Sequence, residues 1–175
     1  MRRAAAGSLG KMTVLGQCVR RSKPSGWIAG PAFDAGRAWS RNAEGIGVWM
    51  PGKVLVVENH DVLRRLYADE FADDGYAVTE AADALAAIDS AARARPDVVV
   101  LGACTSATRE SARGLEALSR FFKSLGCMLV VNAGNLAVVG NDRLAQIADA
   151  IILKCADMGA LKQTLRRLLP GAIPA

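Results

Sequence analysis

The sequence has little of what metal sites, disulfide frameworks and membrane spans require. It contains one histidine, His60, and its four cysteines show neither a CxxC pair nor another metal-ligand spacing. We therefore expect no Cys/His zinc site, and we interpret the cysteines as reduced thiols of a cytoplasmic protein. No apolar run approaches the roughly 20 residues of a membrane-spanning helix, although 51% of the residues are hydrophobic. We expect no membrane association. The four cysteines are Cys18, Cys104, Cys127 and Cys155.

An even spread of positive charge is also absent. Residues 1–49 hold eight Lys/Arg and two Asp/Glu, a net charge of +6, whereas residues 50–175 hold fourteen and fifteen, a net charge of −1; together these give the overall +5. The basic character therefore belongs to the first segment alone. The remainder gives no reason in its composition to expect nucleic-acid binding.

The first 49 residues lack sustained helical or strand periodicity. They are rich in Ala, Gly, Arg and Ser, and they contain all three tryptophans of the chain. We expect this segment to lie outside the fold, either as a disordered basic extension or because translation starts at Met50, which leads directly into the first apolar strand. We expect the folded domain to span residues 50–170 and a short tail to follow at 171–175.

From residue 53 onward, five short apolar strands alternate with helical patterns. The third strand is fully apolar and β-branched, which is typical of a central parallel strand. Such alternation predicts an α/β domain with a five-stranded parallel sheet covered by helices on both faces. The expected strands are Lys53–Val57, Ala77–Glu80, Asp97–Leu101, Cys127–Val131 and Ala150–Leu153. The expected helices are Asp61 to just before Gly75, Asp83–Ala94, Ser111–Leu125, Asp142–Ile147 and Met158–Leu169. We expect Asp61 to cap the first of these helices and Arg64 to lie on its solvated face. The residues expected on its apolar face are Leu63, Leu66, Tyr67 and Phe71.

Five short motifs and two spacings stand out along the predicted domain. The motifs are Lys53–Asn59, Gly75–Val78, Glu80–Asp83, Pro96–Leu101 and Ile152–Lys154. Gly102 precedes Asn132 by 132 − 102 = 30 positions, and Asn132 precedes Lys154 by 154 − 132 = 22 positions. Together these features resemble the two-component response-regulator receiver family. The resemblance covers about residues 53–169 and implies a flavodoxin-like sheet with strand order 2-1-3-4-5.

The resemblance implies a site at the carboxyl ends of the strands, but this chain departs from the family there. Glu58 keeps one carboxylate of the family's acidic pair, and Lys154 keeps its lysine. Gly102 stands at the position of the phosphoryl-accepting aspartate and has no side chain. The remaining departures are Asn59 at the second acidic position, Asn132 at the switch hydroxyl and Ile151 at the switch aromatic.

The charge of this implied pocket argues against the usual chemistry of the family. Three carboxylates and one lysine would give −2, whereas Glu58 and Lys154 alone give zero. Mg²⁺ prefers several oxygen ligands in octahedral geometry, which this set supplies poorly. Without an acceptor carboxylate no acyl phosphate forms. We therefore expect no metal, no cofactor, no catalytic residue and no enzymatic activity, and we expect Lys154 to form a structural ion pair with Glu58.

These observations predict a stand-alone degenerate receiver, a pseudo-receiver, in two-component phosphorelay signalling. Its expected partner is a signalling protein such as a histidine kinase or another regulator, with homodimer formation left open. A different class of function remains open at this point, a small-ligand-binding α/β domain that uses the pocket vacated near Gly102.

Overall fold

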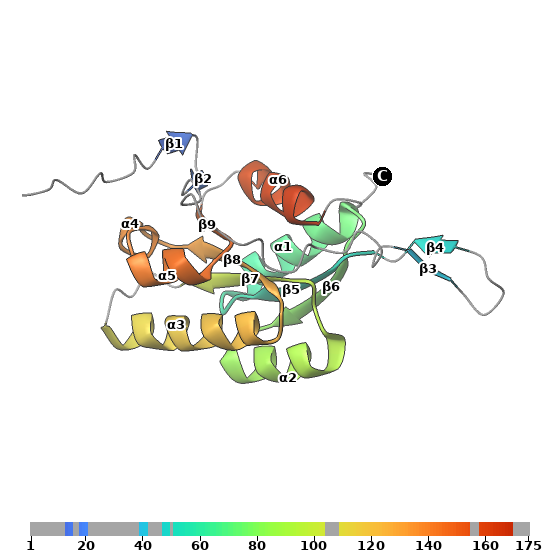
Figure 1. Cartoon of the computed structure of the whole chain (residues 1–175), viewed down its shortest axis with the longest axis horizontal. Helices are drawn as coiled ribbons and strands as arrows, with labels where there is room; N and C mark the ends of the chain where they lie inside the picture. Colours follow the sequence, from blue (N-terminus) through green and yellow to red (C-terminus); the bar gives the residue numbers. More distant parts are fainter. Residues whose placement is uncertain are drawn as a thin grey trace, which may run out of the picture.

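The computed structural model describes residues 51–103, 109–154 and 158–169, together with four three-residue strands in the first 49 residues. The described helices and strands from residue 53 onward form a layered α/β arrangement (Figure 1). None of the helices in these ranges combines the length and the apolar character needed to cross a membrane.

Five parallel strands form the centre of the sheet. Along the chain they are β5 (Lys53–Val57), β6 (Ala77–Ala81), β7 (Val98–Ala103), β8 (Met128–Ala133) and β9 (Ala150–Leu153). Their spatial order is β6-β5-β7-β8-β9, with parallel pairing throughout. This is the order 2-1-3-4-5, so the predicted flavodoxin-like topology is confirmed.

Four short strands precede this sheet. β1 (Thr13–Leu15) pairs with β2 (Cys18–Arg20), and β2 lies antiparallel to β9 at two paired positions. β3 (Trp39–Arg41) and β4 (Gly47–Trp49) form a separate antiparallel pair. Strands of three residues are too short to show a clear alternation, which is why the sequence pattern did not indicate them. That residues 1–49 lie outside the folded domain stays a prediction.

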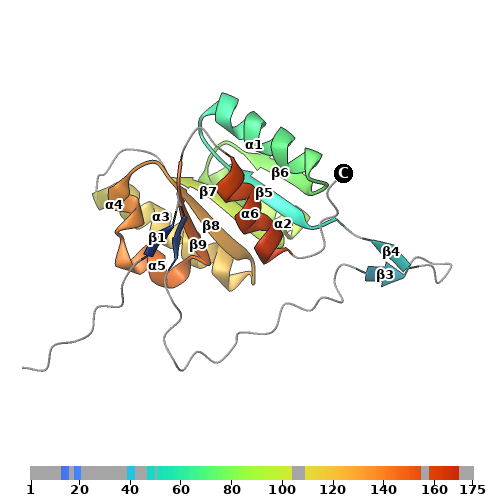
Figure 2. The same ribbon diagram turned by 90° about the horizontal axis from the view of Figure 1, so that it is seen from above.

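Helices cover both faces of the central sheet, as Figure 2 shows from above. α1 (Asp61–Asp73) and α6 (Gly159–Leu168) pack on one face, and α2 (Ala84–Ala94) and α3 (Arg109–Ser124) pack on the other. The second face also receives α4 (Leu136–Val139) and α5 (Asp142–Ile147). The sequence analysis missed α4 because four residues are too few to show a helical period.

The two faces follow from the alternation of side chains along each strand. Val54 and Val56 of β5 belong to the cluster under α1 and α6, which includes Phe71, whereas Leu55 and Val57 belong to the cluster under α2 and α3. The same alternation holds in β7, β8 and β9. Each strand is therefore buried on both sides, as the fully apolar strand patterns predicted.

Several helix ends agree with the sequence, and one does not. Asp83 caps α2 by accepting the Ala86 amide at 2.8 Å, as expected. Gly75 follows the end of α1 at φ 84°, in the left-handed region that glycine tolerates. The cap of α1 was predicted to be Asp61, but it is His60, whose Nδ1 accepts the Leu63 amide at 3.4 Å. Asp61 is instead the first residue of the helix.

The third and fourth strands are longer than predicted. β7 continues to Ala103 and β8 to Ala133, so Gly102 and Asn132 lie within strands rather than after them. Gly102 is paired with Asn132 in the ladder. Hydrogen bonding between neighbouring strands carries the sheet past the end of the apolar runs, and the sequence pattern of either strand alone does not show this.

Candidate functional site

Four of the predicted site residues continue the even-numbered side of their strands. Glu58 follows Val56 in β5, Gly102 follows Val100 in β7, Asn132 follows Val130 in β8 and Lys154 follows Ile152 in β9. The valines and the isoleucine all belong to the cluster under α1 and α6. Alternation therefore brings the four positions to the same face of the sheet, at its carboxyl edge.

Glu58 and Lys154 form an ion pair at this edge. The Lys154 Nζ donates to the Glu58 Oε2 at 2.6 Å, and the two residues are 96 positions apart in the sequence. The Glu58 side chain is 2% exposed and the Lys154 side chain 19% exposed. The ion pair that we expected from the strand order is therefore present, and it is largely withdrawn from water.

Gly102 lies directly beside the Glu58 carboxylate. A Cβ built on Gly102 would lie 2.2 Å from the Glu58 Oε2 and 2.9 Å from its Cδ. It would also lie 3.0 Å from the Val57 carbonyl oxygen. Carbon and oxygen atoms that are not bonded do not approach to 2.2 Å, so the Glu58 carboxylate occupies the space that any side chain at position 102 would enter.

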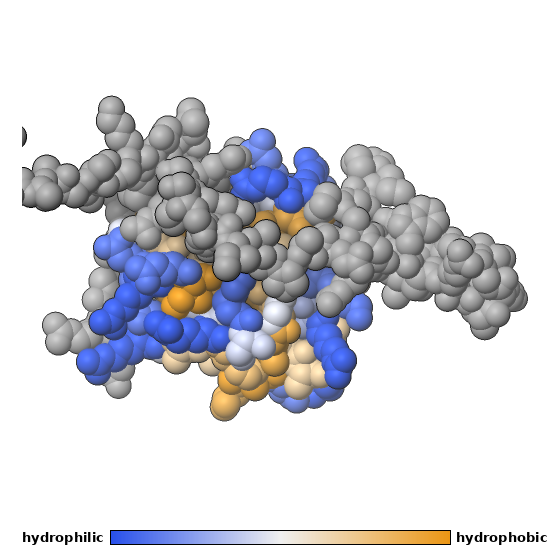
Figure 3. All heavy atoms as spheres, viewed as in Figure 1, coloured by the Kyte–Doolittle hydropathy of each residue, from blue (hydrophilic) through white to orange (hydrophobic). Residues whose placement is uncertain are grey.

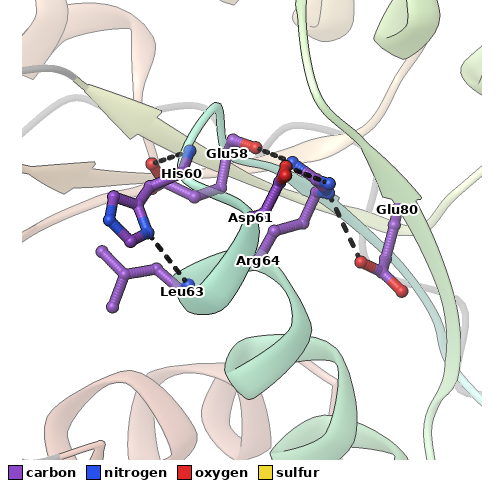
Figure 4. Close-up of polar contacts among 6 residues, drawn as sticks. All are labelled: Glu58, His60, Asp61, Leu63, Arg64 and Glu80. Atoms are coloured by element: carbon purple, nitrogen blue, oxygen red, sulfur yellow. Dashed lines mark hydrogen bonds and ion pairs between the residues drawn. The ribbon is translucent and has the colours of Figure 1, made fainter.

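The second carboxylate oxygen of Glu58 is bound at the start of α1. The His60 backbone amide donates to Glu58 Oε1 at 3.2 Å, while the His60 ring caps the helix by accepting from Leu63 (Figure 4). Each oxygen of Glu58 thus has a donor from this chain. The carboxylate is fixed from two elements, the first turn of α1 and the end of β9.

The Arg64 side chain contacts three residues in the region around Glu58 (Figure 4). Its guanidinium donates to the Glu58 backbone carbonyl at 2.9 Å and to Asp61 at 2.6 Å, and its Nε lies 3.4 Å from Glu80. The hydrogen bond from Arg64 lowers the pKa of the Asp61 carboxyl below its usual value. Arg64 is 13% exposed and connects the end of β5, the first turn of α1 and the edge strand β6.

The remaining predicted site residues lie near this pair in different settings. Asn132 is 2% exposed and occupies the β8 position between Gly102 and Ile152 in the ladder. Asn59 is exposed in the connection between β5 and α1. Ile151 points to the opposite face, within the cluster under α2 and α3, and is 6% exposed. The structure therefore brings Glu58, Gly102 and Lys154 together, with Asn132 beside them.

The arrangement offers little to a divalent cation. Mg²⁺ requires several hard oxygen ligands that it can surround at about 2.0–2.1 Å. Here the one buried carboxylate, Glu58, already holds an ammonium group and a backbone amide. Gly102 supplies no oxygen from a side chain. These residues do not fit the magnesium site that the receiver resemblance implies.

Comparisons with solved structures place this fold among response-regulator proteins. The response regulator TrrA of Thermotoga maritima, in a structure with Mg²⁺ and BeF, is 19% identical with a TM-score of 0.55, covering 67% of this chain and 99% of that one. Chemotaxis protein CheY4 of Vibrio cholerae is 21% identical with a TM-score of 0.57, over 69% and 100%. A CheY-like receiver domain of Methylobacillus flagellatus is 15% identical with a TM-score of 0.58, over 69% and 100%.

This chain has the fold of a response-regulator receiver domain. At these identities the likeness establishes the receiver fold and not the chemistry. No protein-family model and no curated protein matches the chain. The chemistry of this receiver-like domain therefore has to be argued from the residues at its carboxyl edge.

Sequence reasoning missed two residues of this region. Arg64 was interpreted as part of a solvated helix face, yet it bonds the Glu58 carbonyl. Its spacing of three from Asp61 was the available signal, because residues i and i+3 are neighbours on a helix. The capping role of His60 was assigned to Asp61, since aspartate is the commoner N-cap residue. Cys104 and Cys155, which follow β7 and β9, lie outside the described residues.

Proposed function

We propose that this protein is a degenerate receiver in two-component signalling that acts by binding another signalling protein, without phosphorylation of an aspartate. The observation that carries the proposal is Gly102. It stands at the carboxyl end of the central strand β7, where the resemblance puts the phosphoryl acceptor, and it has no side chain to accept a phosphoryl group. The receiver fold around it supports a role among receiver partners.

The carboxyl edge offers no substitute acceptor among the described residues of the pocket. Glu58 is a carboxylate, but it is 2% exposed and already holds Lys154 and the His60 amide. A phosphoryl donor would have to displace both groups to reach it. Asn59 and Asn132 carry amides, which are not nucleophiles of this kind. We accordingly propose no enzymatic activity and no cofactor.

The proposed partner is a histidine kinase or another regulator of the same signalling class. Support comes from α1, where Val62 is 70% exposed and Leu66 is 43% exposed, one helical turn apart. The sequence analysis expected Leu66 on the buried face of this helix, so its exposure is a correction. These two side chains lie on the helix beside the carboxyl edge, and we propose that the partner packs against them.

A second exposed apolar group lies on α2. Figure 3 shows apolar side chains gathered over this helix, where Leu85 is 81% exposed and Ile88 is 38% exposed. α2 packs on the other face of the sheet from α1. Leu85 therefore provides a comparison position for any test of docking on α1.

The small-ligand alternative loses the observation on which it was based. It assumed that the space beside Gly102 is vacant. The Glu58 carboxylate fills that space, 2.2 Å from the position of a Cβ at Gly102. No described feature of the carboxyl edge now favours a ligand-binding role over a protein-binding role.

Phosphorylation and docking can be tested separately. The full chain is incubated with acetyl phosphate and Mg²⁺ beside a receiver domain that carries the acceptor aspartate, and intact mass is measured. We expect the mass of this protein to stay unchanged while the control gains a phosphoryl group. An adduct on this chain that survives acid and hydroxylamine and maps to a Ser or Thr would redirect the proposal. An adduct that hydroxylamine releases and that maps to a carboxylate would refute it.

Docking is tested against the histidine kinases encoded by the source genome, presented one at a time. We expect one of them to bind the full chain and to lose affinity by roughly tenfold or more for Val62→Asp, since a charge then enters an apolar contact. Leu85→Asp serves as the matched control and should leave the affinity unchanged. Equal losses for both variants, or binding by none of the kinases, would count against docking of a kinase on α1.

A further inference from the structure

The position of the Glu58 carboxylate gives a second reason why residue 102 is a glycine. Loss of an acceptor aspartate requires only that position 102 is not an aspartate, and alanine, serine or asparagine would satisfy that. The structure requires that residue 102 has no side chain at all. The distance of 2.2 Å between the Glu58 Oε2 and a Cβ at Gly102 excludes every residue except glycine while Glu58 stays where it is.

Glu58 cannot move aside freely. Its side chain is 2% exposed, so a different rotamer has to find room among packed neighbours. Moving it would also break the 2.6 Å bond to Lys154 and the 3.2 Å bond from the His60 amide. A carboxylate that leaves both donors inside the protein loses much more than a surface carboxylate would.

We infer that Glu58, Gly102 and Lys154 form one interlocked unit, in which the Glu58 carboxylate fills the space of a side chain at position 102 and the Lys154 ammonium neutralises it. The unit closes the carboxyl edge both to a side chain on β7 and to a divalent cation. It joins the ends of β5, β7 and β9 in a single arrangement that needs no phosphate and no metal.

An aspartate at position 102 would not fit beside Glu58. An aspartate introduced alone at position 102 would place its Cβ against the Glu58 oxygen. It would also place its own carboxylate beside that of Glu58. Gly102→Asp is therefore expected to destabilise the domain rather than to restore a receiver site. What this arrangement means for signalling rests on the proposed function. The experiments that test the arrangement measure only the thermal midpoint and its response to a divalent cation.

The test is a cycle of variants in the full chain: Gly102→Ala, Glu58→Ala and the two together. We expect Gly102→Ala alone to lower the thermal midpoint by roughly 5–10 °C, because a methyl group is forced into a filled space. In the Glu58→Ala background the same change should cost less than half as much. Part of the loss in thermal midpoint should remain, because the Val57 carbonyl oxygen lies 3.0 Å from the new Cβ.

Gly114 provides the matched control. It lies in α3, and a Cβ built there has no heavy atom within 4 Å other than those of its chain neighbours and of the backbone of its own helix. Gly114→Ala should leave the thermal midpoint unchanged or raise it, as alanine does in an exposed helix interior. The inference is overturned if Gly102→Ala costs the same with and without Glu58, or if Gly102→Ala behaves like the control.

A second measurement stands even if Gly102→Ala does not fold. The thermal midpoint of the unaltered chain is recorded with increasing MgCl₂, beside Glu58→Gln. We expect no rise in the unaltered chain beyond that seen in Glu58→Gln, because Lys154 already neutralises the carboxylate. A rise that Glu58→Gln abolishes would show a cation at Glu58 and would overturn the inference. A phosphoryl adduct would refute the proposed function and leave the variant cycle unaffected.

Discussion

Breaking the Glu58–Lys154 pair from either side should give unequal losses of stability. Glu58 is 2% exposed, so after Lys154→Met its carboxylate stays buried with the His60 amide as its remaining described donor. We expect a cost of about 3 kcal/mol, the lower end for a buried charge left without its partner. Lys154 is 19% exposed and has a flexible stem, so after Glu58→Gln its ammonium can turn toward water. That variant should cost about 1–2 kcal/mol.

The double variant separates coupling from simple loss of contacts. With both charges gone, Glu58→Gln/Lys154→Met has no stranded ion, and we expect a total cost of about 2 kcal/mol, near that of the weaker single variant. The coupling free energy is then about 2–3 kcal/mol. The assay is urea unfolding followed by circular dichroism, because the helices and strands between residues 53 and 168 all contribute to that signal.

A second ion pair supplies the control for this cycle. Lys123 Nζ lies 2.8 Å from Asp149, also between distant elements, but the two side chains are 35% and 27% exposed. The corresponding cycle should give a coupling below about 1 kcal/mol. If the Glu58–Lys154 cycle were additive within about 0.5 kcal/mol, the two residues would not be coupled and the account of the pocket would be refuted.

Three further predictions follow from other parts of the structure. The Glu70 carboxylate accepts from Lys162 at 2.6 Å and raises the pKa of that lysine above 10.5. The stability lost in Lys162→Met, about 0.5–1 kcal/mol, should therefore be constant from neutral pH to pH 10.5 and should disappear as the pH rises through the raised pKa of Lys162. Urea unfolding in alkaline buffer measures this, and a loss that grows with pH would contradict it. Deleting residues 1–49 should lower the thermal midpoint by only a few degrees, since β2 meets β9 at two paired positions, and should remove all tryptophan fluorescence; a fall of many degrees would place that segment in the folded core. Arg64→Lys should cost about 1–2 kcal/mol by chemical unfolding, because the single nitrogen of lysine cannot take the places of the three guanidinium nitrogens that contact Glu58, Asp61 and Glu80. An unchanged midpoint would mean that these contacts contribute nothing.

The fold could be predicted from the sequence because its signals are local. The strand residues Val98–Leu101 are all apolar, Asp83 caps the helix directly before them, and Gly75 follows the end of α1 with a positive φ. Each of these signals depends only on residues close together in the chain. The alternation of strands and helices then leaves few possible topologies. Strand ends were less certain, because Gly102 joins β7 only through its pairing with Asn132 in β8.

The ion pair could be predicted, but the geometry around it could not. The resemblance to receivers placed Glu58, Gly102 and Lys154 at strand ends that share one edge, and from this we expected Lys154 to pair with Glu58, as it does. It could not show that the Glu58 carboxylate turns into the space of position 102, because that depends on the rotamer of one side chain. The contact of Arg64 with Glu58 could not be predicted either. Its acceptor is a backbone carbonyl, which every residue carries, so the sequence does not indicate which one Arg64 contacts.

We propose that the carboxyl edge is closed to both a phosphoryl group and its metal. The most direct measurement is the amide NMR spectrum of the full chain, recorded alone and with Mg²⁺ and beryllium fluoride, a mimic of an acyl phosphate. We predict that the amide signals of Gly102 and Lys154 stay unshifted, because Glu58 fills the space beside Gly102 and already holds Lys154. Saturable shifts of these signals that require both additives would contradict the account.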